Sequence, residues 1–371
     1  MRIGVVHPTL LKGGGERLAA ILMNGLIVKG HDIALAGLQP LGFDISPKIQ
    51  THFLSKFFPL KPFIFILTVL KMVFVFKPQA IFFSRIFGLS ASFVATILSI
   101  ICPIPRILYV NVRIDAALIN TSGFQDIGKV KKLFMKFFNY LDLCFSIFSM
   151  KKAKYVLCNS EFSKELIKWG EVRVIFPPID TEKFKPNLSK KESNLILYVS
   201  RFAPEKKQDI ALKLFLHMNK ERKYELNLVG HPSFGRFFKT LKAMSEEIPG
   251  SNVIADISEQ QLIEHYQRAT ILWFLRRKEP FGLVPIEGMA CAAIPIALRG
   301  GGVSETIIDK KSGLLCDTYK DLITKTKLVL NDQKLRQKIA QGAIKRANLF
   351  RKEIFINKCE KYIKEAFYQR R

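Results

Sequence analysis

The sequence lacks the features that would indicate a metal site, a disulfide framework or a membrane span. Its six cysteines are scattered without short spacings, which suits a reducing cytosol. The apolar stretches 63–76 and 86–101 are both short for a bilayer span, so we expect buried helices or strands there. Residues 1–6, MRIGVV, predict a strand and not a signal peptide, because no apolar core with a cleavage site follows.

Acidic residues are scarce. The chain has 31 Asp and Glu against 58 Lys and Arg, which gives a formal net charge of +27. Such a charge attracts anions, whether nucleic acid, phosphorylated ligands or an anionic membrane. No Lys/Arg-rich block and no nucleic-acid-binding motif is visible. Only the net charge supports a nucleic-acid partner, so we expect none, and phosphorylated ligands and an anionic membrane remain open.

Apolar runs alternate with helical stretches along the whole chain. A chain that alternates strands with helices favours parallel sheets covered on both faces. We expect strands near 2–7, 31–38, 79–85, 106–112, 153–160, 195–201, 225–230, 252–256, 270–275 and 294–298.

A proline cluster divides the chain into two halves. Pro177, Pro178 and Pro186 lie within residues 175–187, where neither a helix nor a central strand can continue. The predicted organisation is two doubly wound α/β domains joined by a linker. The predicted bounds are 1–176 for the N-terminal Rossmann-like domain, 177–187 for the linker, 188–345 for the C-terminal domain and 346–371 for a final helix.

Residues 129–152 predict an amphipathic helix with a very wide apolar face, because polar residues recur every three or four positions. These polar residues are Lys132, Lys136, Asn139, Asp142, Ser146 and Ser149. Packing in the core explains such a face, and so does docking on a bilayer with the lysines toward anionic headgroups.

The segment EPFGLVPIEGMA, residues 279–290, carries two carboxylates in apolar surroundings. Pro285 suits the first position of a helix, which would place Glu287 in the first turn. Glu279 would lie in the loop at the carboxyl end of a strand, where open α/β sheets bind ligands. The two carboxylates could accept hydrogen bonds from hydroxyl groups of one ligand, or they could be an unrelated helix-start and surface pair.

The backbone amides between the two carboxylates offer a second way to bind a ligand. The amides of Phe281, Gly282 and Leu283 precede the helix and can face a phosphate. A similar feature occurs near the N-terminus, where KGGGERL (12–18) lies between the first strand and the first helix. The amides of Gly14 and Gly15 can meet an anion there, although a flexible turn is an alternative.

These motifs resemble those of retaining family-4 glycosyltransferases. Glu-Pro-Phe-Gly-Leu followed by Pro-Ile-Glu-Gly-Met-Ala resembles their Glu-x7-Glu signature. Similar matches in the expected order are YVSRFAPEKK (198–207), GGVSE (301–305), GLLC (313–316), LCNSEFSKELI (157–167) and HPTLLKGGGERL (7–18). The last of these resembles the opening of the lipid-linked-oligosaccharide mannosyltransferase branch. The resemblance covers roughly residues 1–345.

The resemblance implies a GT-B fold, in which two Rossmann-like domains face each other across a cleft and the C-terminal helices return to the first domain. By the same resemblance, Glu279 binds the transferred sugar and Glu287 the ribose of the nucleotide. Arg201 and Lys206 are cations suited to the charge that develops on the leaving diphosphate. The resemblance also implies front-face substitution, in which the leaving phosphate helps to deprotonate the acceptor. Such a reaction requires no metal and no cofactor besides the nucleotide-sugar substrate.

The resemblance also assigns supporting positions. Phe281, Gly282 and Leu283 would add donor contacts, Gly14 and Gly15 would face the donor diphosphate, and Glu16 and Arg17 would brace the helix. One departure concerns the strand near 106–112. Many relatives carry His-x-Pro at its end, whereas this chain has Asn111 and Arg113, which are the candidate acceptor-side residues. Asn can donate a hydrogen bond but cannot titrate.

The resulting hypothesis is a glycosyltransferase peripherally associated with the cytosolic membrane face, acting on a lipid-linked saccharide. Its first donor candidate is GDP-mannose. The alternatives are a UDP-sugar-dependent transferase that builds a polysaccharide or glycolipid, and a non-catalytic scaffold in glycan assembly. Nothing in the motifs distinguishes guanine from uracil.

Overall fold

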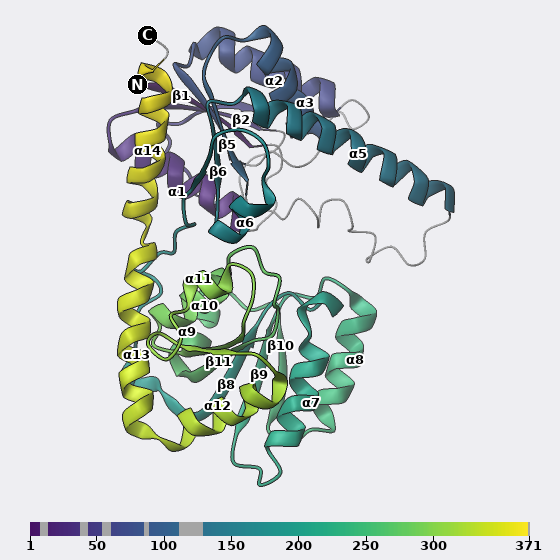
Figure 1. Cartoon of the computed structure of the whole chain (residues 1–371), viewed down its shortest axis with the longest axis vertical. Helices are drawn as coiled ribbons and strands as arrows, with labels where there is room; N and C mark the ends of the chain where they lie inside the picture. The colour runs from purple at the N-terminus through teal and green to yellow at the C-terminus, as the bar shows by residue number, and fades with distance from the viewer. Residues whose placement is uncertain (8–13, 38–43, 54–60, 85–88, 111–128, 370–371) are drawn as a thin grey trace. The chain divides into compact units, whose positions relative to one another are not determined.

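The computed structural model describes residues 1–7, 14–37, 44–53, 61–84, 89–110 and 129–369. The chain forms two compact units. The first comprises Met1–Pro178 with Lys352–Arg371, and the second comprises Ile179–Arg351. Each unit is a parallel sheet with helices packed on its faces (Figure 1), so the predicted α/β class is confirmed.

The first unit contains a seven-stranded sheet in the order β3-β2-β1-β4-β5-β6-β7, with every pair parallel. Strand order reverses direction between β1 and β4, as in doubly wound folds. The strands are β1 Arg2–His7, β2 Asp32–Gly37, β3 Gln50–Phe53, β4 Ala80–Phe83, β5 Arg106–Val110, β6 Tyr155–Cys158 and β7 Val172–Val174.

Helices cover both faces of this sheet. They are α1 Gly14–Val28, α2 Lys61–Phe76, α3 Leu89–Ile101, α5 Lys129–Lys152, α6 Glu161–Leu166 and α14 Lys352–Tyr368. Because successive strand residues point to opposite faces, Val5 packs with residues of α1 and α14, whereas Val6 packs with residues of α2 and α3. The strands are therefore apolar on both sides, as their sequences predicted.

The C-terminal helix α14 belongs to the first unit, where it packs beside α1 (Figure 1). Its Glu360 joins two distant parts of the chain, because it accepts hydrogen bonds from Lys29 at 2.6 Å and from His31 at 3.0 Å. Burial alone would raise the pKa of Glu360, but the bonds from Lys29, Lys364 and His31 lower it to about 2.

The second unit contains a six-stranded parallel sheet in the order β10-β9-β8-β11-β12-β13. Its strands are β8 Glu192–Val199, β9 Glu225–Gly230, β10 Ser251–Ala255, β11 Ala269–Phe274, β12 Ile294–Leu298 and β13 Leu314–Cys316. Its helices are α7 Gln208–Met218, α8 Gly235–Glu246, α9 Glu259–Arg268, α10 Leu283–Ala290, α11 Val303–Thr306, α12 Tyr319–Asn331 and α13 Gln333–Ala347, with short 3-10 turns η1 Leu188–Lys190, η2 Pro204–Lys206 and η3 Asn348–Phe350.

Three short strands were not predicted from the sequence. β7 and β13 have three residues each, too few for a periodic pattern to stand out, and β3 has the mostly polar sequence Gln-Thr-His-Phe. Each pairs with a longer neighbour, which supplies the hydrogen-bonding partner that the sequence does not reveal.

The helix predicted at 129–152 is confirmed as α5, but it is a polar side of this helix, and not the apolar face, that packs against α3. Asp142, Ser146 and Ser149 lie on the side that packs against α3, while much of the apolar face is exposed. The sequence shows two faces, and hydrogen-bonding partners on α3 decide which one is buried. No helix within the described ranges is long and apolar enough to cross a bilayer.

Candidate active site

The sequence-predicted residues of the second unit gather at the carboxyl edge of its sheet. Arg201 and Lys206 follow β8, and Glu279 follows β11, the strand directly beside β8. The strand order changes direction between these two strands, because β9 lies on the other side of β8. Open α/β sheets bind ligands at such a switch point.

Glu279 lies between two cations. Its Oε2 atom accepts a hydrogen bond from Arg276 Nη1 at 2.9 Å and another from Lys206 Nζ at 3.3 Å. All three side chains are mostly buried, with exposed fractions between 17% and 27%. Burial lowers the pKa of Lys206, although the neighbouring Glu279 acts against this shift. The result is a compact charged cluster with fixed positions.

Arg276 was missed by the sequence reasoning, which considered only Arg201 and Lys206 as cations. Its one signal in the sequence is its place three residues before Glu279, in a loop whose conformation the sequence does not show.

The side chain of Arg201 is more exposed than that of Lys206. The Arg201 side chain is 59% exposed and pairs with Glu205 at 3.1 Å, so it can turn toward a ligand at little cost.

Buried contacts fix the backbone that carries Arg201 and Lys206. The side-chain amide of Gln208, which is buried, donates to the carbonyl of Arg201 and to Ser200 Oγ, both at 2.6 Å. The Tyr198 hydroxyl donates to the carbonyl of Lys206. These three hydrogen bonds hold the backbone of the loop in one conformation. The Oε1 atom of Gln208 is buried without a hydrogen-bond partner among the described residues.

Three consecutive glycines support the loop that carries Glu279. The amide of Gly302 donates to the Glu279 carbonyl at 2.9 Å. A Cβ atom on Gly301 would lie 2.5 Å from that carbonyl oxygen, and one on Gly302 would lie 2.2 Å from the Pro280 carbonyl oxygen. Gly301 also has a φ of +60°, which disfavours other residues. Only glycine lets the two backbone segments approach so closely.

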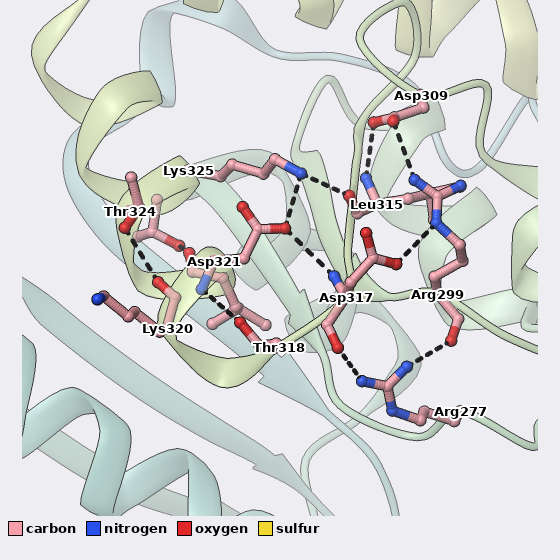
Figure 2. Close-up of polar contacts among 12 residues, drawn as sticks. Arg277, Arg299, Asp309, Leu315, Asp317, Thr318, Lys320, Asp321, Thr324 and Lys325 are labelled. Carbon is pink, nitrogen blue, oxygen red and sulfur yellow. Dashed lines mark hydrogen bonds and ion pairs between the residues drawn. The ribbon is translucent and has the colours of Figure 1, made fainter.

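A network of charged residues holds the same loop to β12 and β13 (Figure 2). Arg277 donates to the carbonyls of Arg299 and Asp317. Arg299 in turn pairs with Asp317 at 3.0 Å and with Asp309 at 3.2 Å. These groups are partly exposed, so each pair is weak alone, but a network of several fixes the loop more firmly.

Helix α10 begins earlier than predicted. The structure places its first residue at Leu283, so Pro285 is the third helical residue and Glu287 lies in the second turn. The expectation that Pro285 begins the helix was therefore wrong. Gly282, with a φ of +94°, turns the chain into the helix two residues sooner. Pro285 is tolerated because amides of the first turn have no intrahelical acceptor.

Glu287 has a partner that the sequence did not reveal. Its Oε2 atom accepts a hydrogen bond at 2.9 Å from the hydroxyl of Tyr266, which lies in α9 and is fully buried. The Tyr266 carbonyl accepts from Lys191 Nζ at 3.1 Å, and burial lowers the pKa of Lys191 to about 7. Phe281 is also buried, against Phe350, so only its backbone can serve a ligand.

In the first unit, Gly14 and Gly15 are the first residues of α1. Glu16, the next residue, is buried, and its Oε1 lies 3.6 Å from Nε2 of the fully buried His7. The acceptor-side candidates Asn111 and Arg113 lie outside the described residues.

In the part of the chain that the structure describes, no three His, Cys, Asp or Glu side chains form a group that could hold a metal ion.

The fold is that of GT-B glycosyltransferases. The structure superimposes on sucrose-phosphate synthase from Thermosynechococcus elongatus with a TM-score of 0.81, at 17% identity over 99% of both chains. It also superimposes on HepE from Anabaena, solved with UDP and glucose, with a TM-score of 0.74 at 17% identity over 98% of this chain and 100% of that one.

The second unit matches a family by sequence. Residues 179–346 match the family model described as Glycosyl transferases group 1. D-inositol 3-phosphate glycosyltransferase from Acidothermus cellulolyticus is 29% identical over 203 residues, covering 48% of this chain and 44% of that protein. Alpha-1,3/1,6-mannosyltransferase ALG2 from Dictyostelium discoideum is 27% identical over 247 residues, covering 55% and 59%. The chain thus spans about half the length of the curated relatives it matches.

Proposed function

We propose that this protein is a retaining glycosyltransferase of family 4 that transfers a hexose from a nucleoside-diphosphate sugar. The observation that carries this proposal is the pairing of Glu279 with Lys206 and Arg276 at the switch point of the second sheet. A carboxylate held in one orientation can accept hydrogen bonds from sugar hydroxyls, and adjacent cations can stabilise phosphate charge. The match of residues 179–346 to group 1 glycosyltransferases agrees with this chemistry.

Each residue has a specific role in the proposed reaction. Glu279 binds the transferred sugar and Glu287 binds the ribose. Lys206 and the mobile Arg201 contact the diphosphate, and backbone amides near Gly282 add donor contacts. When the sugar–phosphate bond breaks, negative charge grows on the distal phosphate, and these two cations stabilise it without a metal ion. The acceptor oxygen bonds to the anomeric carbon on the face from which the phosphate departs, and that phosphate takes the acceptor's proton, so the anomeric configuration is retained.

We further propose a lipid-linked saccharide as the acceptor, at the cytosolic face of an anionic membrane. The first unit is rich in phenylalanine, with twenty of the 31 in residues 1–180, and the chain carries a net charge of +27. Both properties suit a protein that rests on such a membrane. Mannose is the first candidate sugar, with the relative named alpha-1,3/1,6-mannosyltransferase as support.

Calorimetric titration of the full chain with GDP, UDP, ADP and their sugar conjugates tests the donor site. We expect one diphosphate to bind, and Glu287→Ala to weaken it by about tenfold or more, equivalent to about 1.4 kcal/mol. Glu221→Gln is the matched control, because Glu221 is exposed and forms its ion pair with Lys223 at 2.5 Å. It should leave the affinity unchanged.

The same titration decides between the alternatives. Binding of GDP supports the mannosyltransferase, and binding of UDP supports a transferase that builds a polysaccharide or glycolipid. If no nucleotide binds to the folded protein, a non-catalytic role in glycan assembly replaces the proposed activity. Adding EDTA during turnover tests metal independence, because a metal-dependent enzyme would lose its activity.

A further inference from the structure

Helix α5 buries a polar stripe and the apolar Met150 against the protein, and it exposes a second set of apolar side chains to solvent. Asp142 accepts a hydrogen bond from Ser92 of α3, and Ser149 lies 2.9 Å from Thr96 of the same helix. Ser146 and Ser149 are at most 1% exposed. Asp142 and Ser149 thus hydrogen-bond to α3, and Ser146 is buried on the same side of α5 without a hydrogen-bond partner among the described residues.

The outer face is rich in large apolar side chains. Those that are 38–68% exposed are Leu133, Phe134, Phe137, Phe138, Tyr140 and Phe148. Leu133, Phe137 and Tyr140 follow at spacings of four and three residues, so they share one side of the helix. The N-terminal half of α5 extends beyond α3 in Figure 1. Contiguous exposed aromatic groups of this kind mark an interaction site.

The charge of α5 indicates what covers this face. The helix has six lysines, Lys129, Lys131, Lys132, Lys136, Lys151 and Lys152, and one acidic residue. Lys136, Lys151 and Lys152 are exposed, whereas Asp142 accepts a hydrogen bond from Ser92 of α3. A second copy of this chain would bring the same lysines and another +27 of net charge, so like charges would oppose association. An anionic surface with an apolar interior complements both properties.

We propose that the outer face of α5 docks on an anionic phospholipid bilayer, with the phenylalanines at the acyl boundary and the lysines among the headgroups. This inference rests on the proposed function, since a lipid-linked acceptor would meet the enzyme at that bilayer. The docking surface, however, belongs to the first unit and Glu279 to the second, and membrane binding can be measured without donor or acceptor.

Vesicle flotation of the full chain tests the proposal. Wild-type protein should float with vesicles that contain phosphatidylglycerol, and far less with phosphatidylcholine alone or at high salt. Phe137→Ser with Phe138→Ser should reduce the bound fraction at least tenfold. Lys136→Gln with Lys151→Gln and Lys152→Gln should weaken binding to the anionic vesicles only. The control Leu216→Ser with Leu328→Ser removes two residues of the second unit with similar exposure and should bind as wild type.

Measurements of thermal stability, donor affinity and self-association separate the possible outcomes. The thermal midpoint and the calorimetric donor affinity of the phenylalanine variant should equal those of wild type, because both side chains are exposed. Equal flotation of wild type and this variant, or no flotation of wild type, would overturn the proposal. Self-association of wild type in light scattering, lost in the variant, would instead assign the face to a second copy. Failure of donor binding with normal flotation would refute only the proposed activity.

Discussion

The proposed chemistry depends on the carboxylate of Glu279. Arg276 donates to it at 2.9 Å, and a hydrogen bond to a charged group contributes about 1.5–3 kcal/mol. We therefore expect Arg276→Gln to lower kcat by about tenfold to a hundredfold, while KM for the donor changes less. Steady-state kinetics measure both. Arg236→Gln, an exposed arginine of α8, is the control and should leave kcat unchanged.

Tyr266 acts through Glu287. Because the ring is fully buried beside Phe184 while the hydroxyl donates to Glu287 at 2.9 Å, Tyr266→Phe removes one hydrogen bond and keeps the packing. We expect the nucleoside diphosphate to bind several-fold more weakly, corresponding to about 1 kcal/mol. Titration of the variant measures this. An unchanged affinity, with the fold intact, would show that Tyr266 does not orient the ribose-binding carboxylate.

At the scale of elements, the loop that carries Glu279 depends on glycines from a neighbouring segment. Gly301→Ala would place a Cβ about 2.5 Å from the Glu279 carbonyl oxygen at a φ of +60°. The backbone strain is about 1–2 kcal/mol before the loop moves. We expect a lower thermal midpoint together with a lower transfer rate. Gly235→Ala is the matched control, since nothing lies within 4 Å of its Cβ and its φ is ordinary.

Helix α14 predicts a pH effect on the first unit. The pKa of Glu360 falls from 4.5 to about 2 in the folded protein, so its stabilisation is present above pH 4.5 and is lost as the pH falls toward 2. Glu360→Gln should reduce the free energy of unfolding near neutral pH by at most about 3 kcal/mol. Denaturant titrations from neutral to acidic pH should show the two proteins converge in this window. A constant difference would contradict the assigned role.

At the scale of the whole molecule, the α/β class and the long strands could be predicted because apolar runs alternate with helical stretches. The Glu279 and Glu287 pair could be found because both lie in one short motif. Tyr266 could not, because it reaches Glu287 from α9, and nothing in the sequence shows that α9 and α10 are neighbours. The buried side of α5 was equally hidden, since its polar partners Ser92 and Thr96 lie on α3.

Transfer of labelled hexose to a membrane lipid extract tests the central claim most directly. The donor is the nucleotide sugar that binds best in titration, and wild type is compared with Glu279→Gln. We predict labelled lipid with wild type and a loss of about a hundredfold or more in the variant, which should still bind the nucleoside diphosphate. Equal transfer by both proteins, or no transfer by wild type with any donor that it binds, would contradict the proposed function.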